Sequence, residues 1–164
     1  MTSQNIKQQV LAAVVLLGLT FIAAAIGGVG SASAGTFYQQ LNLPAFAPPA
    51  WVFGPVWSVL YLMMGVAAFL VWRSKTLDST RPVLTLYVIH LAVNALWSWL
   101  FFAWRSGLWA SIGVLLLLAL VVWVTLRFRY FSRVAALLMV PYLVWVSFAT
   151  LLTITIWQMN PAQL

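Results

Sequence analysis

Residues 82–104 read PVLTLYVIHLAVNALWSWLFFAW, an apolar run without a single charged side chain. About 20 consecutive, mostly apolar residues are enough for a helix to cross the hydrocarbon core of a bilayer. This stretch is therefore predicted to be a membrane-spanning helix. Four more stretches of this kind occur in the 164-residue chain, so the five predicted spans are residues 10–29, 51–72, 82–104, 108–126 and 134–157.

The composition of the whole chain agrees with a membrane protein. Apolar residues make up 65% of it and charged residues 5%, whereas soluble domains carry about 25% charged residues. There is one acidic residue (Asp78), one histidine (His90) and no cysteine. A paired-carboxylate mechanism, a thiolate metal site and a disulfide are therefore excluded, and we expect neither a bound metal nor a cofactor.

The basic residues lie between the predicted spans and indicate the topology. Arg105 stands alone on one side. The other side holds seven: Lys7, Arg73, Lys75, Arg81, Arg127, Arg129 and Arg133. The positive-inside rule then places the N-terminus in the cytoplasm, and the C-terminus and the loop 30–50 outside. These residues mark where the chain leaves the lipid, and they do not form the basic face on a soluble fold that would indicate nucleic-acid binding.

Prolines and tryptophans mark several span ends. Pro55 and Pro82 are predicted to lie in first turns, where a missing N–H costs nothing. Pro141 falls inside the fifth span, where it is predicted to kink the helix and to free the carbonyl of Leu137. An aromatic belt at the lipid–water boundary explains the tryptophans at span ends, which are Trp51, Trp72, Trp104, Trp109 and Trp157.

The N-terminal region allows a second interpretation. Lys7, the apolar run from Val10, and the triplet Ala32-Ser33-Ala34 together resemble a signal peptide with its cleavage site. A single lysine is a weak positive region, and the apolar run is long for a signal peptide, so we favour a retained first span. No internal repeat is visible, and residues 1–164 are expected to form a single domain, an all-α membrane protein built as a five-helix bundle.

The loop 30–50 is unusual because it carries no charge although it is predicted to lie outside the hydrocarbon. Long loops without regular structure are usually functional or disordered, and this one is too apolar for disorder. Its prolines, Pro44, Pro48 and Pro49, stiffen it. It is either a plug over polar helix ends or a lid over a cavity, and one segment can be both.

One face of the third span carries polar and aromatic side chains. His90, Asn94, Trp97 and Phe101 recur at i, i+4, i+7 and i+11, which places them on one side of a helix. Intramembrane polar side chains usually point into the bundle. For His90 we favour a structural hydrogen bond to a neighbouring helix, and for Asn94 beside Trp97 we favour a pocket.

Two other spans contribute residues at a similar depth. Trp57 and Tyr61 share a face of the second span, and on the fifth span Trp145 is too deep for an aromatic belt, with the small Ala149 one turn further on. At about 1.5 Å per residue, all of these lie in the half of the bundle nearest the uncharged loop. An apolar, aromatic pocket with one or two polar anchors is typical of a small-molecule site.

The same residues resemble the TspO/translocator-protein family of tryptophan-rich sensory proteins. The similar segments are Phe37-Tyr38-x-x-Leu41-x-x-Pro44, Pro48-Pro49-x-Trp51-x-Phe53-x-x-x-Trp57-x-x-Leu60-Tyr61, Asn94-x-x-Trp97-x-x-x-Phe101-Phe102 and Pro141-Tyr142-Leu143-x-Trp145-x-x-x-Ala149-Thr150. They extend over nearly the whole chain.

The resemblance implies a five-helix bundle in a bacterial membrane, usually a homodimer, that binds tetrapyrroles such as protoporphyrin IX and haem, or sterols and benzodiazepine-type ligands. By motif position, the ligand-binding residues would be Tyr38, Trp57, Tyr61, Asn94, Trp97, Trp145 and Ala149. Bacterial relatives have been proposed to degrade porphyrins oxidatively with two tryptophans, which would correspond to Trp57 and Trp145.

Three positions depart from the family pattern. Leu43 stands where a lysine is common, Phe46 where a tryptophan is common, and Thr153 where an asparagine is frequent. Without the loop lysine, the carboxylates of an anionic porphyrin lose a partner, although Arg105 could attract one. We favour a binding, translocating or sensory protein for a hydrophobic tetrapyrrole, with a tryptophan-dependent, light-driven porphyrin-degrading enzyme as the alternative. A proton-driven transporter is disfavoured because such proteins rely on intramembrane Asp, Glu or His relays and this chain offers His90 alone.

Overall fold

The computed structural model describes residues 5–164, and it confirms the predicted all-α class. Five candidate membrane spans are present within that range. The long helices are α1 (Ile6–Gly30), α3 (Phe53–Ser74), α4 (Leu77–Ser98), α5 (Gly107–Phe131) and α6 (Arg133–Met159). Short segments connect or extend them: α2 (Ala34–Gln40), a 3₁₀ turn (Ala50–Val52) before α3, and a π-helical turn (Trp99–Ala103) that continues α4.

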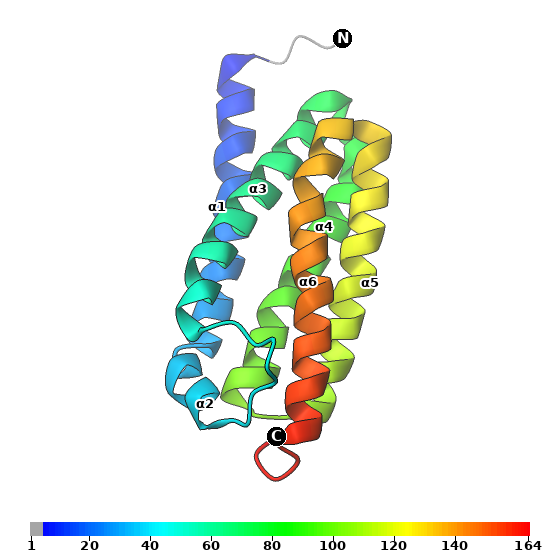
Figure 1. The fold of residues 1–164 in the computed structure, drawn as a ribbon. Helices are drawn as coiled ribbons and strands as arrows, with labels where there is room; N and C mark the ends of the chain where they lie inside the picture. Colours follow the sequence, from blue (N-terminus) through cyan, green and yellow to red (C-terminus); the bar gives the residue numbers. More distant parts are fainter. Residues whose placement is uncertain (1–4) are drawn as a thin grey trace.

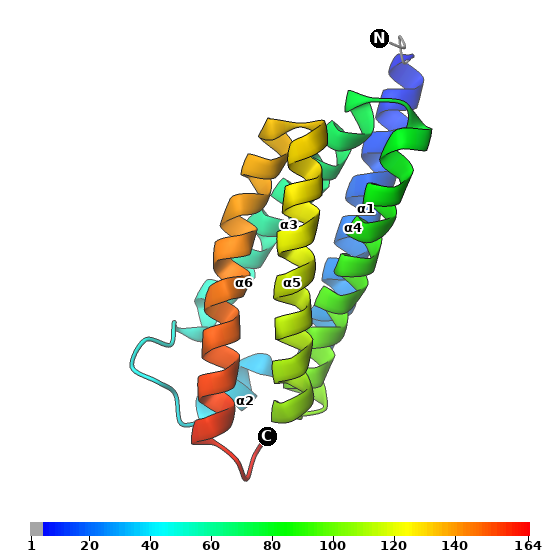
Figure 2. The same ribbon diagram turned by 90° about the vertical axis from the view of Figure 1, so that its right-hand side faces the viewer.

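The long helices run alongside one another in an up-and-down bundle (Figure 1). Helix α5 packs against α4 and α6, while α1 packs against α3 and α4. Seen after a quarter turn, α5 and α6 lie on one side of the bundle and α1 and α4 on the other (Figure 2). The bundle thus has two distinct ends: a basic end, where α3 meets α4 and α5 meets α6, and a loop end, where α2 and the C-terminus lie.

Several helices extend further than the apolar runs predict. Helix α4 begins at Leu77, so Pro82 is inside the helix and not in its first turn. Helix α5 continues through Arg127 and Arg129 to Phe131. Apolar length sets the membrane-embedded part, but long basic side chains can stay helical and reach water beyond it. Both differences arise because the change in composition marks the lipid boundary and not the end of the hydrogen-bonded helix.

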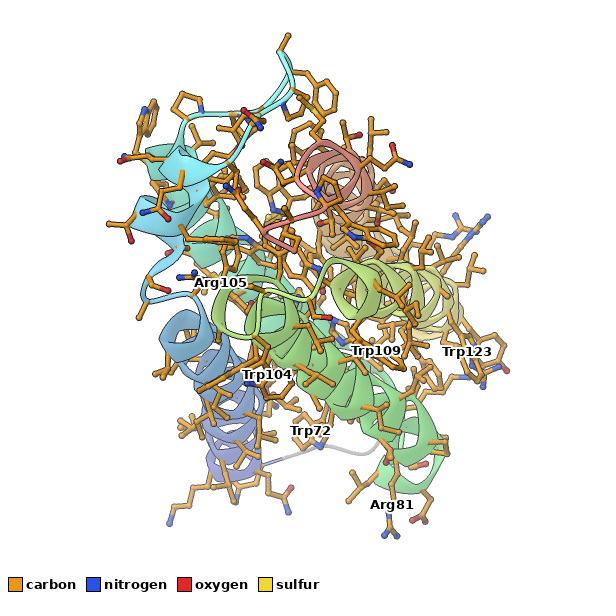
Figure 3. The ribbon with its side chains drawn as sticks, turned by 90° about the horizontal axis from the view of Figure 1, so that it is seen from below. Trp72, Arg81, Trp104, Arg105, Trp109 and Trp123 are labelled. Atoms are coloured by element: carbon orange, nitrogen blue, oxygen red, sulfur yellow. The ribbon has the colours of Figure 1, made fainter. Side chains whose placement is uncertain are left out.

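The seven basic residues predicted to share one side all lie at the basic end. They are found near the starts of α1, α4 and α6 and near the ends of α3 and α5. Lys75 sits over the ring of Tyr130, 4.6 Å from its centre, which joins the end of α3 to the end of α5. Arg81 lies near the start of α4, whereas Arg105 lies in the connection between the π-helical turn and α5, and the view along the bundle shows the two well apart (Figure 3). Trp123 is an exposed side chain of α5.

Close packing at the loop end depends on glycines facing tryptophans. A Cβ atom on Gly30 would come within 2.7 Å of the Trp99 ring, and one on Gly107 would overlap Trp157. The Trp99 indole N–H also donates to the carbonyl of Ile26, at 3.0 Å. The first contact holds α1 against the π-helical turn after α4, beside the cavity described next, and the second holds α5 against α6.

Candidate functional site

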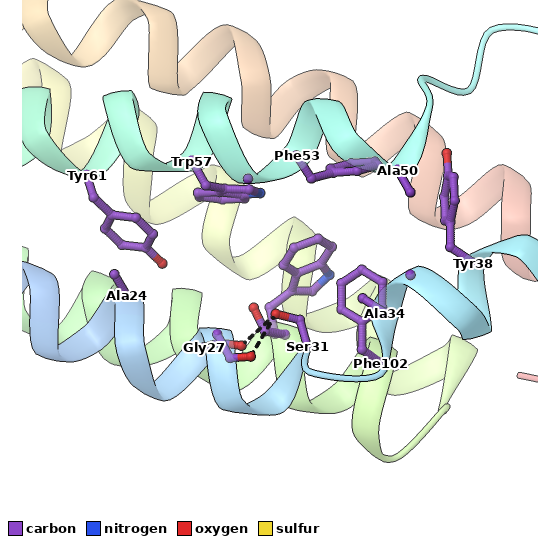
Figure 4. Close-up of a pocket in the computed structure, with 15 residues that line it drawn as sticks. Ala24, Gly27, Ser31, Ala34, Tyr38, Ala50, Phe53, Trp57, Tyr61 and Phe102 are labelled. Atoms are coloured by element: carbon purple, nitrogen blue, oxygen red, sulfur yellow. Dashed lines mark hydrogen bonds between the residues drawn. The ribbon is translucent and has the colours of Figure 1, made fainter.

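A cavity of about 330 Å³ opens at the loop end between α1, α2, α3 and α4. Its aromatic lining is formed by Tyr38, Phe53, Trp57, Tyr61, Trp97 and Phe102, and its opposite wall by small residues of α1 and α2 (Figure 4). Among the described residues, none of those that line the cavity is charged. Its volume lies at the lower end of the range of about 300–1,000 Å³ for small-molecule sites.

Trp57 is the central side chain of the aromatic wall. Its ring centre lies 5.6 Å from that of Tyr61, 6.4 Å from Trp97 and 6.1 Å from Tyr142. Ring pairs at these separations are in the favourable range for aromatic contact. Trp57 therefore joins the cavity wall to the core of the bundle.

Asn94 lies behind this wall and not in the cavity lining. Its Oδ1 accepts a hydrogen bond from the Tyr61 hydroxyl at 2.6 Å, and its Nδ2 donates to the Tyr142 hydroxyl at 2.6 Å. A buried amide with both ends bonded in this way holds three helices together. The structure thus assigns Asn94 a bracing role, with Tyr61 as its link to the cavity.

His90 forms a different contact from the one expected. Its Nδ1 lies 2.7 Å from the Tyr87 carbonyl of its own helix, whereas a bond to a neighbouring helix was predicted. The Nε2 atom is buried and has no hydrogen-bond partner in the described part of the chain. A hydrogen bond between α4 and α1 is formed instead by Tyr87, one turn before His90, whose hydroxyl lies 2.7 Å from the hydroxyl of Thr20 on α1.

The α6 candidates lie outside the cavity lining. Trp145 packs edge-on against Phe53, with ring centres 5.9 Å apart, and so contacts the wall from behind. Ala149 is buried in the apolar cluster that also holds Trp97 and Leu41. The structure therefore brings Tyr38, Trp57, Tyr61 and Trp97 together around one cavity and leaves Asn94, Trp145 and Ala149 as a second layer.

The loop between α1 and α3 contains a helix, α2, that the sequence analysis did not predict. Phe37, Tyr38 and Leu41 turn their side chains inward and are nearly fully buried. The Tyr38 hydroxyl donates to the carbonyl of Pro48 at 3.0 Å, and burial raises the pKa of this phenol above its ordinary value. The phenol thus stays protonated and keeps donating at neutral pH.

Two further contacts fasten the loop to the bundle. The N–H of Asn42 donates to Asn160 Oδ1 at 2.8 Å, and Asn160 Nδ2 donates back to the Asn42 carbonyl at 2.9 Å. Arg105, a residue with a left-handed backbone (φ 50°), lies with its guanidinium 4.6 Å from the centre of the Phe37 ring. The loop is therefore both a plug over the helix ends and a cover for the cavity.

Some residues that line the cavity were not predicted from the sequence as site residues. Phe53 and Phe102 line the cavity next to residues that were predicted, and a rule that includes aromatic neighbours of Trp57 and Trp97 would have found them. The small residues of α1 and α2 gave no such signal, because glycine and alanine are equally common in ordinary helix packing.

The chemistry available in this cavity is apolar contact and ring stacking. Residues 5–164 contain no group of three His, Cys, Asp or Glu side chains that could hold a metal ion. The hydroxyls of Tyr38, Tyr61 and Ser31 all donate within the protein. The indole N–H of Trp97 finds no acceptor among residues 5–164, but this atom is buried and is not exposed to the cavity.

An apolar five-span bundle with an uncharged aromatic cavity under a fastened loop defines a class of small membrane-embedded proteins built around a ligand-sized pocket. The TspO/MBR family matches residues 11–158. The chain is 37% identical to the tryptophan-rich protein TspO of Chlorobaculum tepidum over 163 residues, which is 94% of this chain and 99% of that one. It therefore belongs to the TspO/MBR family and is a multi-pass integral membrane protein.

Other relatives share most of this length. The human translocator protein is 37% identical over 126 residues, 76% of this chain and 75% of its own. Protein CrtK of Rhodobacter capsulatus is 34% identical over 153 residues, 90% and 94% of the two chains.

Proposed function

We propose that this protein binds a flat, hydrophobic tetrapyrrole in the loop-end cavity, as a translocating or sensory protein, with protoporphyrin IX as the representative ligand. The observation that carries the proposal is the aromatic wall formed by Trp57, Trp97 and Phe53 around a cavity of about 330 Å³. Faces of aromatic side chains suit a planar conjugated ring. The volume admits part of a macrocycle, so the rest extends through the open side.

The names of the relatives agree with this proposal at a general level. One is called a translocator protein and another a tryptophan-rich protein. Two tryptophans, Trp57 and Trp97, are among the aromatic residues that line the cavity, which gives the second name a physical sense here. The absence of charge among the described lining residues favours ligands whose ring, and not their carboxylates, enters the protein.

A titration with protoporphyrin IX in the dark tests the proposal on detergent-purified protein. Tryptophan quenching and the shift of the porphyrin absorption band should both saturate. Trp97→Leu should raise the Kd about two- to tenfold, since an aromatic pair contributes roughly 0.5–1.5 kcal/mol beyond its area. The matched control is Trp123→Leu, at an exposed tryptophan of α5, which should leave the Kd unchanged.

Two outcomes would reject the proposal. One is quenching that does not saturate or that equals the signal from porphyrin in empty micelles. The other is an equal loss of affinity in both tryptophan variants, because it would indicate general partitioning into the apolar surface.

A second candidate function is the light-driven oxidation of the bound porphyrin by dioxygen. It is favoured by the contacts of Trp57 with Tyr61 and Trp97, which place several oxidisable rings next to the cavity. Trp57→Phe should then slow the illuminated loss of the porphyrin absorption band, while Trp123→Phe should not. Equal loss in both variants, and in empty micelles, would indicate ordinary photobleaching.

A further inference from the structure

The cavity has one side on which the backbone is bare. Gly28 of α1, Gly35 of α2 and Gly54 of α3 all line the cavity and are all exposed. A Cβ atom built on any of the three would meet no atom of another described segment within 4 Å. These three residues, which come from three separate elements, are called the glycine gap.

The glycine gap differs from the packed glycines close to it. Gly27, one residue earlier on α1, would place a Cβ atom 3.3 Å from Ser98 Oγ, and Gly30 would meet the Trp99 ring. Gly27 and Gly30 thus serve close packing of α1 on α4, whereas Gly28 serves no packing contact. Close helix approach therefore does not explain the glycine gap.

The rest of the loop, from Phe37 onward, is fastened to the bundle by several independent contacts. They comprise the reciprocal Asn42–Asn160 pair, the Tyr38–Pro48 hydrogen bond, and Arg105 over Phe37. Phe37 and Tyr38 are also buried in the apolar cluster. Entry beneath the loop would have to break these contacts, whereas entry through the glycine gap breaks none of them.

The glycine gap lies at the level where the chain leaves the membrane. Gly28 is two residues from the end of α1, and Gly54 is the second residue of α3. The neighbouring exposed side chains Ile26, Val29 and Trp51 are large and apolar, as expected at the boundary between lipid tails and headgroups. We therefore expect the glycine gap to lie at the bilayer interface.

We propose that the glycine gap is a side portal through which a planar, membrane-dissolved ligand passes between the bilayer interface and the cavity. The portal suits an amphiphilic ring compound whose polar edge stays at the headgroup level while its flat face slides past bare backbone. Beyond the gap, the cavity offers the aromatic side chains of Trp57, Phe53 and Phe102. The inference rests on the proposed binding of such a ligand in this cavity.

The test is a stopped-flow measurement on protein reconstituted in lipid nanodiscs, mixed with vesicles that carry protoporphyrin IX, in the dark. Gly28→Leu and Gly54→Leu narrow the gap. Both should lower the association and dissociation rates together, by about tenfold or more, since an obstructed path slows passage in both directions without a matching change in affinity. Gly18→Leu is the matched control, because Gly18 on the same helix also has open space around it but does not line the cavity.

Asn160→Ala provides the competing test, because it removes the side chain that fastens the loop. The portal predicts an unchanged association rate in this variant. A faster association in Asn160→Ala, together with unchanged rates in the glycine variants, would overturn the portal in favour of entry under the loop. A raised dissociation rate with unchanged association in Gly28→Leu would also overturn it, because the leucine would then only fill the binding site.

The same data separate this inference from the proposed function. Absence of saturable binding in the unmodified protein would reject ligand binding itself. Normal binding with unaffected rates in both glycine variants would reject the portal alone.

Discussion

At the scale of single residues, the most consequential side chain is Asn94, which no ligand contacts in our assignment. It bridges the hydroxyls of Tyr61 and Tyr142, and all three groups are buried. The spacing of residues 90, 94, 97 and 101 correctly predicted a shared inward face, but periodicity specifies direction and not partners. Which polar group bonds to which depends on residues from other helices, here at positions 61 and 142, that no local pattern connects.

Asn94→Ala should lower the Tm more clearly than it raises the Kd for porphyrin. Removing the amide leaves two buried tyrosine hydroxyls unpaired, and in a double-mutant cycle with Tyr142→Phe we expect a coupling of about 0.6–1.7 kcal/mol, the range for hydrogen bonds between membrane helices. Thermal unfolding in detergent, followed by circular dichroism, measures both.

The matched comparison is Ser147→Ala, whose exposed hydroxyl bonds only to the Leu143 carbonyl of its own helix. It should be close to neutral. Strictly additive effects of Asn94→Ala and Tyr142→Phe would show that the bracing role is wrong.

At the scale of elements, the sequence predicted the number and approximate positions of the five spans, because apolar length is a strong signal. It predicted their ends less well. Pro82 was interpreted as a start signal but lies inside α4, and the arginines near residue 128 were interpreted as a loop but lie in α5. Helix α2 was missed altogether, since seven residues held by tertiary contacts carry too little periodicity to recognise.

The pair of Asn42 and Asn160 joins the loop to the end of α6 across 118 positions of sequence. We expect Asn160→Ala to increase the rate of chymotrypsin cleavage after Phe46, an exposed loop residue. Local opening limits proteolysis of folded segments, and the substitution removes two of the hydrogen bonds that oppose this opening.

Limited proteolysis followed by mass spectrometry measures the effect. Gln158→Ala is the control on the same helix, because Gln158 is exposed, and its cleavage rate should match that of the unmodified protein. Equal rates in Asn160→Ala would show that the buried aromatic side chains alone hold the loop.

At the scale of the whole molecule, the two ends differ in charge. Seven cations lie at the basic end and Arg105 at the loop end. The positive-inside rule therefore predicts a cytoplasmic basic end and an outward-facing cavity. The orientation decides from which leaflet a ligand would reach the glycine gap.

The lack of cysteine makes this orientation simple to measure. Gln39→Cys on α2 and Leu77→Cys at the start of α4 both introduce thiols at exposed positions. A membrane-impermeant maleimide added to intact cells should label the first and not the second, and both should react after the membrane is opened. The reverse pattern would place the basic end outside.

The hydrogen bonds of α4 also bear on how the protein responds to bilayer thickness. This helix is bonded side chain to side chain with α1 through Tyr87 and Thr20, and with α3 and α6 through Asn94. Sliding any of these helices along its axis would break a bond in a medium that offers no replacement. A thinner or thicker membrane is therefore met by tilting of the bundle as one body and by deformation of the surrounding lipid, so hydrophobic mismatch would change how the protein sits in the membrane while leaving the shape of its cavity intact.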